Sequence, residues 1–234
     1  IGRLVGSEMC IRDRYKSYMS TAVVFGGTGL VGNHLLKILI NDDYYSKVKV
    51  FTRSKIEIIH HKLEIIETNF INIESLKDKI SADSCFFCIG TTKKNSPQKL
   101  EYKRIELELP KNIAQICKSN GISSFVFVSS GFANPNHSGE YLRFKGLVEE
   151  ELKSLSFENL GILRPSFLLG KRKQFRILET IGIYIFSFLS PFFIGPLKKM
   201  KPIHANTVAK AMSNIIKKNL SQVTYESDEI VRIS

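Results

Sequence analysis

The sequence has 234 residues, of which 43% are hydrophobic and 24% are charged, and its formal net charge is +12. These proportions are ordinary for a soluble globular protein and exclude a mainly disordered chain. The length suits one α/β domain with a core large enough to fold without disulfides or metals. The basic residues are mostly scattered, without aromatic interleaving or zinc-finger spacing, so we expect no specific nucleic-acid partner.

The four cysteines do not form the framework of a secreted protein, and no secretory signal is expected before them. We therefore expect a cytoplasmic protein. Cys85 and Cys88 form a C-x-x-C pattern within an apolar run that is typical of a buried strand. Because residues three apart on a strand point to opposite faces, their sulfurs are not expected to converge on a metal. Small buried residues are the better interpretation.

Residues 1–18 show no helical or strand periodicity, and we expect a non-native or disordered extension before a single domain at residues 19–234. In that domain apolar runs alternate with helical patterns. Strands that alternate with helices indicate a doubly wound parallel sheet with helices on both faces, an α/β fold. The predicted strands are Thr21–Phe25, Val48–Thr52, Leu63–Glu67, Cys85–Ile89, Phe125–Ser129 and Leu160–Leu163, and the predicted helices are Leu30–Ile40, Pro97–Asn120 and Glu140–Leu155.

An uncharged segment extends from Thr180 to Gly195, and lysines follow it at Lys198, Lys199 and Lys201. The segment is interrupted by a proline and is shorter than the roughly 20 residues that a helix needs to cross a bilayer. We expect a core or interface helix that covers the active site. Shallow docking on a membrane surface, assisted by the lysines, is the alternative.

A glycine-rich motif, Gly26-Gly27-Thr28-Gly29-Leu30-Val31-Gly32, joins the first predicted strand to the first predicted helix. Gly26 permits a tight exit from the strand, Gly29 lets the backbone approach a pyrophosphate, and Gly32 allows the helix to pack closely on the strand. Unpaired amides and the dipole at the helix start then bind the phosphates. The position of this motif between strand and helix predicts a dinucleotide-binding Rossmann fold.

The end of the second predicted strand indicates which dinucleotide binds. An NAD site usually carries Asp or Glu there, which accepts hydrogen bonds from the ribose. This chain instead has Arg53, followed by Ser54 and Lys55. A guanidinium pairs with a 2′-phosphate through two hydrogen bonds, whereas a carboxylate would repel it. The sequence therefore predicts NADP(H) as the cofactor.

Ile89, Gly90 and Thr91 follow the fourth predicted strand. In a doubly wound sheet this position is at the carboxyl edge beside the switch point, where ligands bind. We expect these residues to line the cofactor groove through their backbone. A simple turn is the alternative interpretation.

Ser129 and Ser130 end the fifth predicted strand, and Tyr141 and Lys145 begin the next helix. Residues four apart share a helix face, so the ammonium of Lys145 can stabilise the phenolate of Tyr141. At ~4 Å and an effective dielectric constant near 20, that attraction is at most roughly 4 kcal/mol. Tyr141 would donate a proton to a carbonyl oxygen as hydride arrives, while a serine hydroxyl holds that oxygen. We prefer Ser130, because strand alternation lets one of the two serines face the site.

The Tyr-x-x-x-Lys pattern alone is not specific, because Tyr45 and Lys49 match it too. That second pair runs into a strand, where side chains four apart are separated by roughly 13 Å. Tyr141 is therefore the better candidate, and a purely structural Tyr–Lys pair is the alternative.

Together these residues resemble the atypical short-chain dehydrogenases/reductases, and more closely the Tat-interacting-protein oxidoreductase group with its bacterial relatives. The resemblance covers about residues 20–212 and includes the segments Cys88–Lys94, Val128–Ser130, Ala133–Asn136, Tyr141–Gly146, Leu163–Gly170, Gly195–His204 and Val208–Met212. It implies NADPH contacts by Thr28, Arg53, Ser54, Ile89, Gly90, Tyr141, Lys145, Leu168 and Arg176, with Tyr141 as the proton donor. The candidate cofactor set also includes Leu30, Val31, Thr91 and Pro165.

The leading hypothesis is an NADP(H)-dependent oxidoreductase, a monomer or homodimer, that acts on a small carbonyl or alcohol. A non-catalytic NADPH-binding regulator or scaffold, in contact with a membrane surface, is the alternative. The Ser130–Tyr141–Lys145 set argues against this non-catalytic alternative, because binding alone does not need all three residues. The uncharged Thr180–Gly195 segment favours the non-catalytic alternative. The segment after Gly170 is short, so we expect it to form only a small C-terminal part on the substrate side. Nucleotide-sugar epimerases have a large substrate subdomain, and we therefore do not expect this chain to be one.

Overall fold

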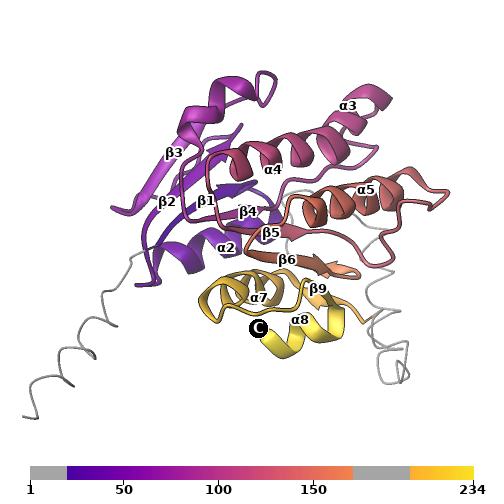
Figure 1. Ribbon diagram of the computed structural model, residues 1–234. Coiled ribbons are helices and arrows are strands. Elements are labelled where there is room, and N and C mark those ends of the chain that lie inside the picture. Colours follow the sequence, from indigo (N-terminus) through magenta and orange to yellow (C-terminus); the bar gives the residue numbers. More distant parts are fainter. Residues whose placement is uncertain (1–19, 171–200) are drawn as a thin grey trace, which may run out of the picture.

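The computed structural model describes residues 20–170 and 201–234. Within these ranges the centre of the molecule is a seven-stranded parallel sheet in the order β3-β2-β1-β4-β5-β6-β9 (Figure 1). The strand order reverses between β1 and β4, which creates a switch point at the carboxyl ends of these strands. The doubly wound parallel sheet predicted from the sequence is therefore confirmed. Its strands are β1 (Ser20–Phe25), β2 (Tyr45–Thr52), β3 (Leu63–Glu67), β4 (Ser84–Phe87), β5 (Ser124–Val128), β6 (Asn159–Arg164) and β9 (Thr224–Glu226).

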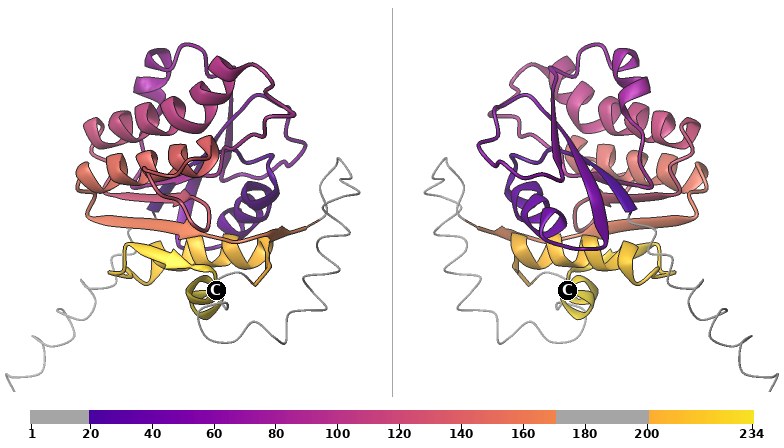
Figure 2. Two further views of the ribbon diagram at one scale, coloured as in Figure 1. Left: turned by 90° about the vertical axis from the view of Figure 1, so that its right-hand side faces the viewer. Right: turned by 90° about the vertical axis from the view of Figure 1, so that its left-hand side faces the viewer.

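Helices cover both faces of the sheet, as Figures 1 and 2 show. Alternate residues of β1 enter two separate cores: Ala22 and Val24 pack on one face, and Val23 and Phe25 on the other. A strand that is buried on both faces is apolar along its whole length, which explains the continuous apolar runs in the sequence. One face carries α2 (Leu30–Ile40), α7 (Ala205–Lys217) and α8 (Ser227–Ile233), and the other carries η2 (Glu74–Lys79), α3 (Lys99–Lys103), α4 (Leu109–Ser119) and α5 (Glu140–Ser154).

The two cysteines of the C-x-x-C pattern lie on opposite faces of the sheet. Cys85 belongs to the core beneath α4, whereas Cys88 packs against the core on the side of α7, with its Sγ 3.9 Å from Sδ of Met212. The prediction that their sulfurs point apart is confirmed. Burial raises the pKa of the Cys88 thiol to about 12, so this thiol is neutral at physiological pH.

The helix predicted over Pro97–Asn120 contains a π-helical turn, η3 (Arg104–Glu108), between α3 and α4. Pro110 gives the physical reason. It has no N–H to donate to the carbonyl of Glu106, and its ring would clash with that carbonyl in a regular α-helix. The amide of Leu109 bonds instead to the carbonyl of Arg104, five residues earlier. Such turns are frequent at functional sites, and Glu106 within this one is buried.

A second small sheet lies beside the first, where β7 (Leu168–Leu169) pairs in parallel with β8 (Ile203–His204). The described part of the chain contains no helix that is long and apolar enough to cross a membrane. The predicted extension at residues 1–18, the candidate Arg176 and the uncharged Thr180–Gly195 segment lie outside the described residues.

Gly146 lies where α5 passes closest to the loop before it. A Cβ here would be 2.3 Å from the backbone nitrogen of Pro135 and 2.4 Å from the carbonyl carbon of Asn134. We predict that Gly146→Ala lowers the free energy of unfolding by about 1–3 kcal/mol, because no rotamer change relieves a clash with backbone. Urea denaturation measures this. Glu150→Ala, an exposed change on the same helix, should alter it by less than about 0.5 kcal/mol, and equal stability of the two variants would contradict the prediction.

Candidate functional site

The loop between β1 and α2 is folded tightly because of its glycines. Gly26 has a φ of 87°, and a Cβ there would lie 2.9 Å from the backbone of Cys88 and Ile89 at the end of β4. A Cβ on Gly32 would lie 2.1 Å from the carbonyl oxygen of Gly26, so helix and loop touch through backbone alone. The first-turn amides of α2 have no acceptors within the helix, which leaves them available to an anion at the carboxyl edge of the sheet.

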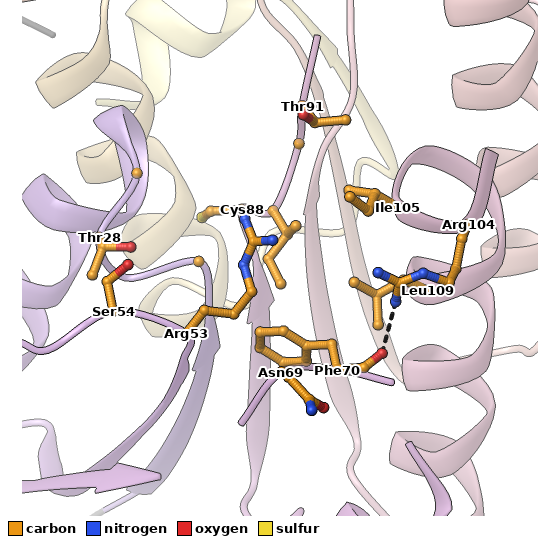
Figure 3. Close-up of a pocket in the computed structure, with 14 residues that line it drawn as sticks. Thr28, Arg53, Ser54, Asn69, Phe70, Cys88, Thr91, Arg104, Ile105 and Leu109 are labelled. Carbon is orange, nitrogen blue, oxygen red and sulfur yellow. Dashed lines mark hydrogen bonds between the residues drawn. The ribbon is translucent and has the colours of Figure 1, made fainter. Parts of the chain in front are cut away.

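A cavity of about 190 Å³ opens beside this loop, and the loops after β1, β2, β3 and β4 surround it together with the π turn (Figure 3). It collects eight residues that the sequence analysis assigned to the cofactor: Gly26, Thr28, Gly29, Arg53, Ser54, Ile89, Gly90 and Thr91. Seven other candidates among the described residues do not line it: Leu30, Val31, Gly32, Tyr141, Lys145, Pro165 and Leu168. Six lining residues were missed: Asn69, Phe70, Cys88, Arg104, Ile105 and Leu109.

Two guanidinium groups line the cavity, and none of the lining residues is acidic. Arg53 extends between Thr28 and Ser54 on one side and Arg104 on the other (Figure 3). Nη1 of Arg104 donates a hydrogen bond of 2.8 Å to the carbonyl of Phe70. The glycine cradle, the free amides and the two cations therefore fit a phosphate-bearing ligand. Asn69 could have been found from its position after β3, but Arg104 is brought to the cavity by the π turn, which no sequence pattern indicated.

Tyr141 and Lys145 lie on one face of α5, as their spacing predicts. Nζ of Lys145 is 5.8 Å from the centre of the Tyr141 ring and 4.9 Å from the centre of the Phe127 ring. Tyr141 is 38% exposed, whereas Lys145 is 3% exposed. A half-exposed phenol is thus accessible to a small molecule, with a buried ammonium behind it.

The ammonium of Lys145 pairs with Glu106, whose Oε2 lies 3.1 Å from Nζ. The other carboxylate oxygen, Oε1, accepts a hydrogen bond from the backbone amide of Thr91, which lines the cavity. Burial has the largest single effect and lowers the pKa of Lys145, but the nearby Glu106, Tyr141 and Glu149 together outweigh it, with Glu106 the strongest of the three, and the pKa is raised above its ordinary value. Lys145 is therefore charged at neutral pH.

The sequence did not reveal Glu106, so the estimate of the electrostatic attraction between Lys145 and the Tyr141 phenolate treated the ammonium as unpaired. An adjacent carboxylate opposes that field, so the attraction at the phenolate is weaker than the upper limit of roughly 4 kcal/mol for an unpaired ammonium. The helical spacing could have revealed Glu106. One face of the pattern contains Tyr102, Glu106 and Ile113, so a carboxylate lies on an otherwise apolar face. A buried acid in such a position is a functional candidate.

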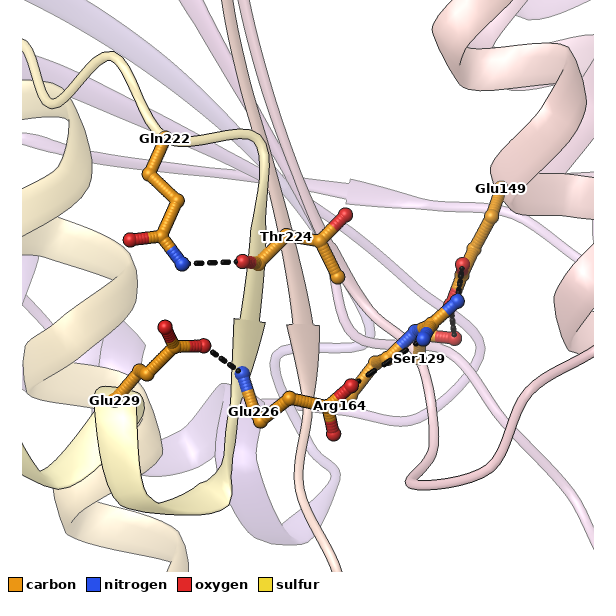
Figure 4. Close-up of polar contacts among 7 residues, drawn as sticks. All are labelled: Ser129, Glu149, Arg164, Gln222, Thr224, Glu226 and Glu229. Atoms are coloured by element: carbon orange, nitrogen blue, oxygen red, sulfur yellow. Dashed lines mark hydrogen bonds and ion pairs between the residues drawn. The ribbon is translucent and has the colours of Figure 1, made fainter. Parts of the chain in front are cut away.

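The hydroxyl of Ser129 points into an ionic network with Glu149 and Arg164 (Figure 4), and Ser129 is not among the residues that line the cavity. Its Oγ donates a 2.5 Å hydrogen bond to Oε1 of Glu149, and Arg164 donates to both oxygens of the same carboxylate at 3.0 and 2.5 Å. Arg164 also pairs with Glu226 at 3.3 Å, which joins β5, α5, β6 and β9. By contrast, Ser130 is partly exposed, and its Oγ makes no hydrogen bond within the described ranges.

The loops that follow β5 and β6 are joined beside Ser130. The amide of Gly131 donates a hydrogen bond of 2.9 Å to the carbonyl of Pro165, a residue predicted to contact the cofactor. Phe132 has a φ of 65° and is 59% exposed. A left-handed conformation is uncommon for a bulky residue and is often associated with functional sites. This loop fixes Ser130 at the same edge of the sheet as Tyr141.

A cavity at the switch point of a doubly wound sheet is where such folds bind dinucleotides. Here the glycine loop and two guanidiniums line the cavity, and the Tyr–Lys pair on the helix after β5 lies behind its wall, where Glu106 contacts both Lys145 and the amide of Thr91. This arrangement defines the class: a nicotinamide-dinucleotide-binding Rossmann protein of the short-chain dehydrogenase/reductase type.

The comparisons with known proteins identify the family within this class. Residues 26–182 match a family described as NAD(P)H-binding. Protein FMP52-1, mitochondrial, of Scheffersomyces stipitis is 31% identical over 216 residues, which cover 89% of this chain and 91% of that protein. Protein HTATIP2 of Rattus norvegicus is 27% identical over 183 residues, which cover 76% of this chain and 75% of that protein. The chain belongs to the NAD(P)H-binding family as an atypical short-chain dehydrogenase/reductase related to HTATIP2, and the resemblance seen in the sequence is confirmed.

The solved structures support the fold. The Bordetella bronchiseptica enzyme WbmH in complex with NAD⁺ superposes with a TM-score of 0.68 at 16% identity, covering 89% of this chain and 75% of that chain. A UDP-N-acetylglucosamine 4-epimerase from Methanobrevibacter ruminantium superposes with a TM-score of 0.63 at 20% identity, covering 88% of this chain and 74% of that chain. At such identities the likeness concerns the fold alone.

The expected cytoplasmic location is contradicted by the comparisons. Several fungal relatives, from Candida glabrata, Scheffersomyces stipitis, Coccidioides immitis and Candida albicans, are named mitochondrial proteins. The Candida glabrata protein is 35% identical over 154 residues, and the match covers 66% of each chain. The absence of a recognisable secretory signal was the basis of the expectation, and it does not distinguish the cytoplasm from an organelle.

The two adjacent serines allow a stability test of the ionic network. We predict that Ser129→Ala lowers the free energy of unfolding by about 1.5–3 kcal/mol, because it removes a buried hydrogen bond to a carboxylate. Ser130→Ala is the matched control and should change it by less than about 0.5 kcal/mol. Thermal or urea unfolding of both variants provides the measurement. A larger loss for Ser130→Ala than for Ser129→Ala would be inconsistent with the contacts described.

Proposed function

We propose that this chain is an NADP(H)-dependent oxidoreductase that interconverts a small carbonyl compound and the corresponding alcohol. The observation that carries the proposal is the buried, charged Lys145, which lies between the Glu106 carboxylate and the ring of the half-exposed Tyr141. Burying a cation is unfavourable unless it is paired. An accessible phenol with a buried cation behind it suits proton transfer to a substrate oxygen, in addition to any contact that the two side chains make with the dinucleotide.

The side chains have distinct roles in the proposed reaction. Bound NADPH supplies the hydride to the carbonyl carbon. Tyr141 donates its phenolic proton to the carbonyl oxygen, and the Lys145 ammonium stabilises the phenolate that remains. Ser130 donates a hydrogen bond to the same oxygen, because the hydroxyl of Ser129 is already engaged by Glu149. In the reverse direction Tyr141 accepts the alcohol proton.

The preference for NADP(H) over NAD(H) is supported by the charges around the cavity. Arg53 follows β2 at the position where NAD sites usually carry an acid, and Arg104 adds a second guanidinium. The absence of a carboxylate among the described lining residues removes the repulsion that would oppose a 2′-phosphate. The remaining expectations stay predictions: a monomer or homodimer, no specific nucleic-acid partner, and either an interface role or membrane docking for Thr180–Gly195.

Cofactor preference is the first test. NADPH should bind at least tenfold more tightly than NADH, which corresponds to about 1.4 kcal/mol, and Arg53→Ala should abolish most of that difference. Fluorescence titration of the protein with each dinucleotide measures both constants. Lys47→Ala, which removes an exposed cation that pairs with Glu64 on β3, should retain the preference. Equal affinities of the wild-type protein for the two dinucleotides would remove the argument for the 2′-phosphate.

Turnover of a Tyr141→Phe variant separates an enzyme from a non-catalytic binding protein. With NADPH and a panel of small carbonyl compounds, the rate should fall by about 10²–10⁴, or roughly 3–5 kcal/mol, because the general acid is lost. The dissociation constant of NADPH should change far less, since the phenol contributes at most one neutral hydrogen bond of about 1 kcal/mol.

Two further variants complete this test. Ser130→Ala should lower turnover while the protein keeps its stability, because its hydroxyl contacts the substrate oxygen and no other described group. Tyr45→Phe, at the buried start of β2, should leave turnover intact, because this tyrosine matches the pattern by chance. If Tyr141→Phe reduces substrate at the wild-type rate, the non-catalytic alternative is favoured.

A further inference from the structure

Glu106 lies between the cofactor cavity and the catalytic helix, and its side chain is fully buried. One carboxylate oxygen accepts the amide of Thr91 in the cavity wall, and the other pairs with Lys145 on α5. The second oxygen has no hydrogen-bond partner among the described residues, so the ion pair is its principal interaction. A Cβ on Gly90 would lie 3.4 Å from the first oxygen, so this carboxylate lies directly behind the lining of the cavity.

We propose that Glu106 is a positioning residue that keeps Lys145 ionised and ties it to the Ile89–Thr91 segment of the cofactor cavity. The inference rests on the proposed function, because it assigns Glu106 a part in the same site. It differs from a purely structural role, in which the carboxylate would only fill space within the π turn.

The charged and titratable groups around Lys145 indicate that its ionisation depends on Glu106. Glu149, on the same helix, is held by both Arg164 and Ser129, and it raises the pKa of Lys145 less than Glu106 does. Cys88, from the end of β4, carries a neutral thiol because burial raises its pKa to about 12. Tyr141, whose ring centre is 5.8 Å from Nζ, raises the pKa of Lys145 in the same direction as Glu106 but less strongly. Among the described residues Glu106 is therefore the strongest of the groups that keep Lys145 charged, and it is the one in ion-pair contact with it, at 3.1 Å.

Removing the charge of Glu106 would leave burial opposed by the weaker influences of Tyr141 and Glu149. Burial disfavours a charged amine and lowers its pKa. A neutral Lys145 would no longer stabilise the phenolate of Tyr141, so proton transfer would slow as pH rises through the lowered pKa. The effect on rate would then depend on pH, whereas a defect in packing would lower the rate similarly at every pH.

Glu106→Gln provides the direct test, because the amide keeps an oxygen for the Thr91 N–H and removes the negative charge. Its matched control is Glu108→Gln in the same π turn, where the carboxylate makes an exposed ion pair with Lys103 at 3.0 Å. The titration of Lys145 is followed by ¹³C NMR in protein with ¹³C-labelled lysine, with and without NADPH, and Lys145→Met assigns the signal. The pH dependence of NADPH-linked carbonyl reduction is measured in parallel.

We expect Lys145 of the wild-type protein to titrate above the ordinary lysine pKa of about 10.4. In Glu106→Gln both this titration and the alkaline limb of the rate profile should move at least one pH unit lower, while Glu108→Gln should match the wild type. The proposal is overturned if the wild-type Lys145 titrates below that ordinary value, a measurement that does not require the variant to fold. It is also overturned if Glu106→Gln leaves the titration unchanged.

The two proposals fail separately. If the wild-type protein shows no hydride transfer with any carbonyl compound but Lys145 titrates as expected, the oxidoreductase function is wrong and the positioning of Lys145 by Glu106 stands. If turnover depends on Tyr141 but the Lys145 titration is the same in wild type and Glu106→Gln, Glu106 has only a structural role.

Discussion

The ammonium of Lys145 is removed from water, and the arrangement of the catalytic side of the molecule depends on how that charge is compensated. An unpaired buried charge would be strongly unfavourable, so Lys145 requires a partner that is itself buried and satisfied. Glu106 meets this requirement because the Thr91 amide occupies its other oxygen. The ion pair therefore connects three elements that are separate in sequence: the cofactor-lining loop after β4, the π turn and α5.

The π turn and the sheet topology place this ion pair beside the cofactor cavity. Pro110 interrupts regular α-helical hydrogen bonding, and the resulting turn carries Arg104 to the cavity and Glu106 to Lys145. On the other side, close contact between Gly26 and the end of β4 brings the two central loops together. The ionic network of Ser129, Glu149 and Arg164 then holds the loops after β5 and β6, from which Ser130 reaches the site.

The comparisons establish the family, but the reaction has to be inferred from the residues of the site. The fold is shared with the enzyme WbmH at 16% identity and with a UDP-N-acetylglucosamine 4-epimerase at 20% identity, and such likeness carries no substrate information. Cellular location is also independent of the packed core, because targeting signals are read by receptors and not by the fold. The expected cytoplasmic location is contradicted by fungal relatives that are named mitochondrial proteins. The residues of the core could not have tested that expectation.

Local sequence determined the elements and the glycine loop. Leu30–Ile40 and Leu63–Glu67 were predicted with the bounds that the structure shows, because burial on fixed faces imposes a helical or strand period on neighbouring residues. Eight cavity residues were predicted: the glycines from their motif, Arg53 and Ser54 from their place after the second strand, Ile89–Thr91 from the carboxyl edge of the sheet, and Thr28 from the family resemblance. Tertiary structure alone decided the pairing of Lys145 with Glu106, the engagement of Ser129 by Glu149 and the arrival of Arg104 in the cavity. Each of these depends on side chains from separate elements meeting in a buried place, and their electrostatic and hydrogen-bonding requirements leave no periodic pattern in the sequence.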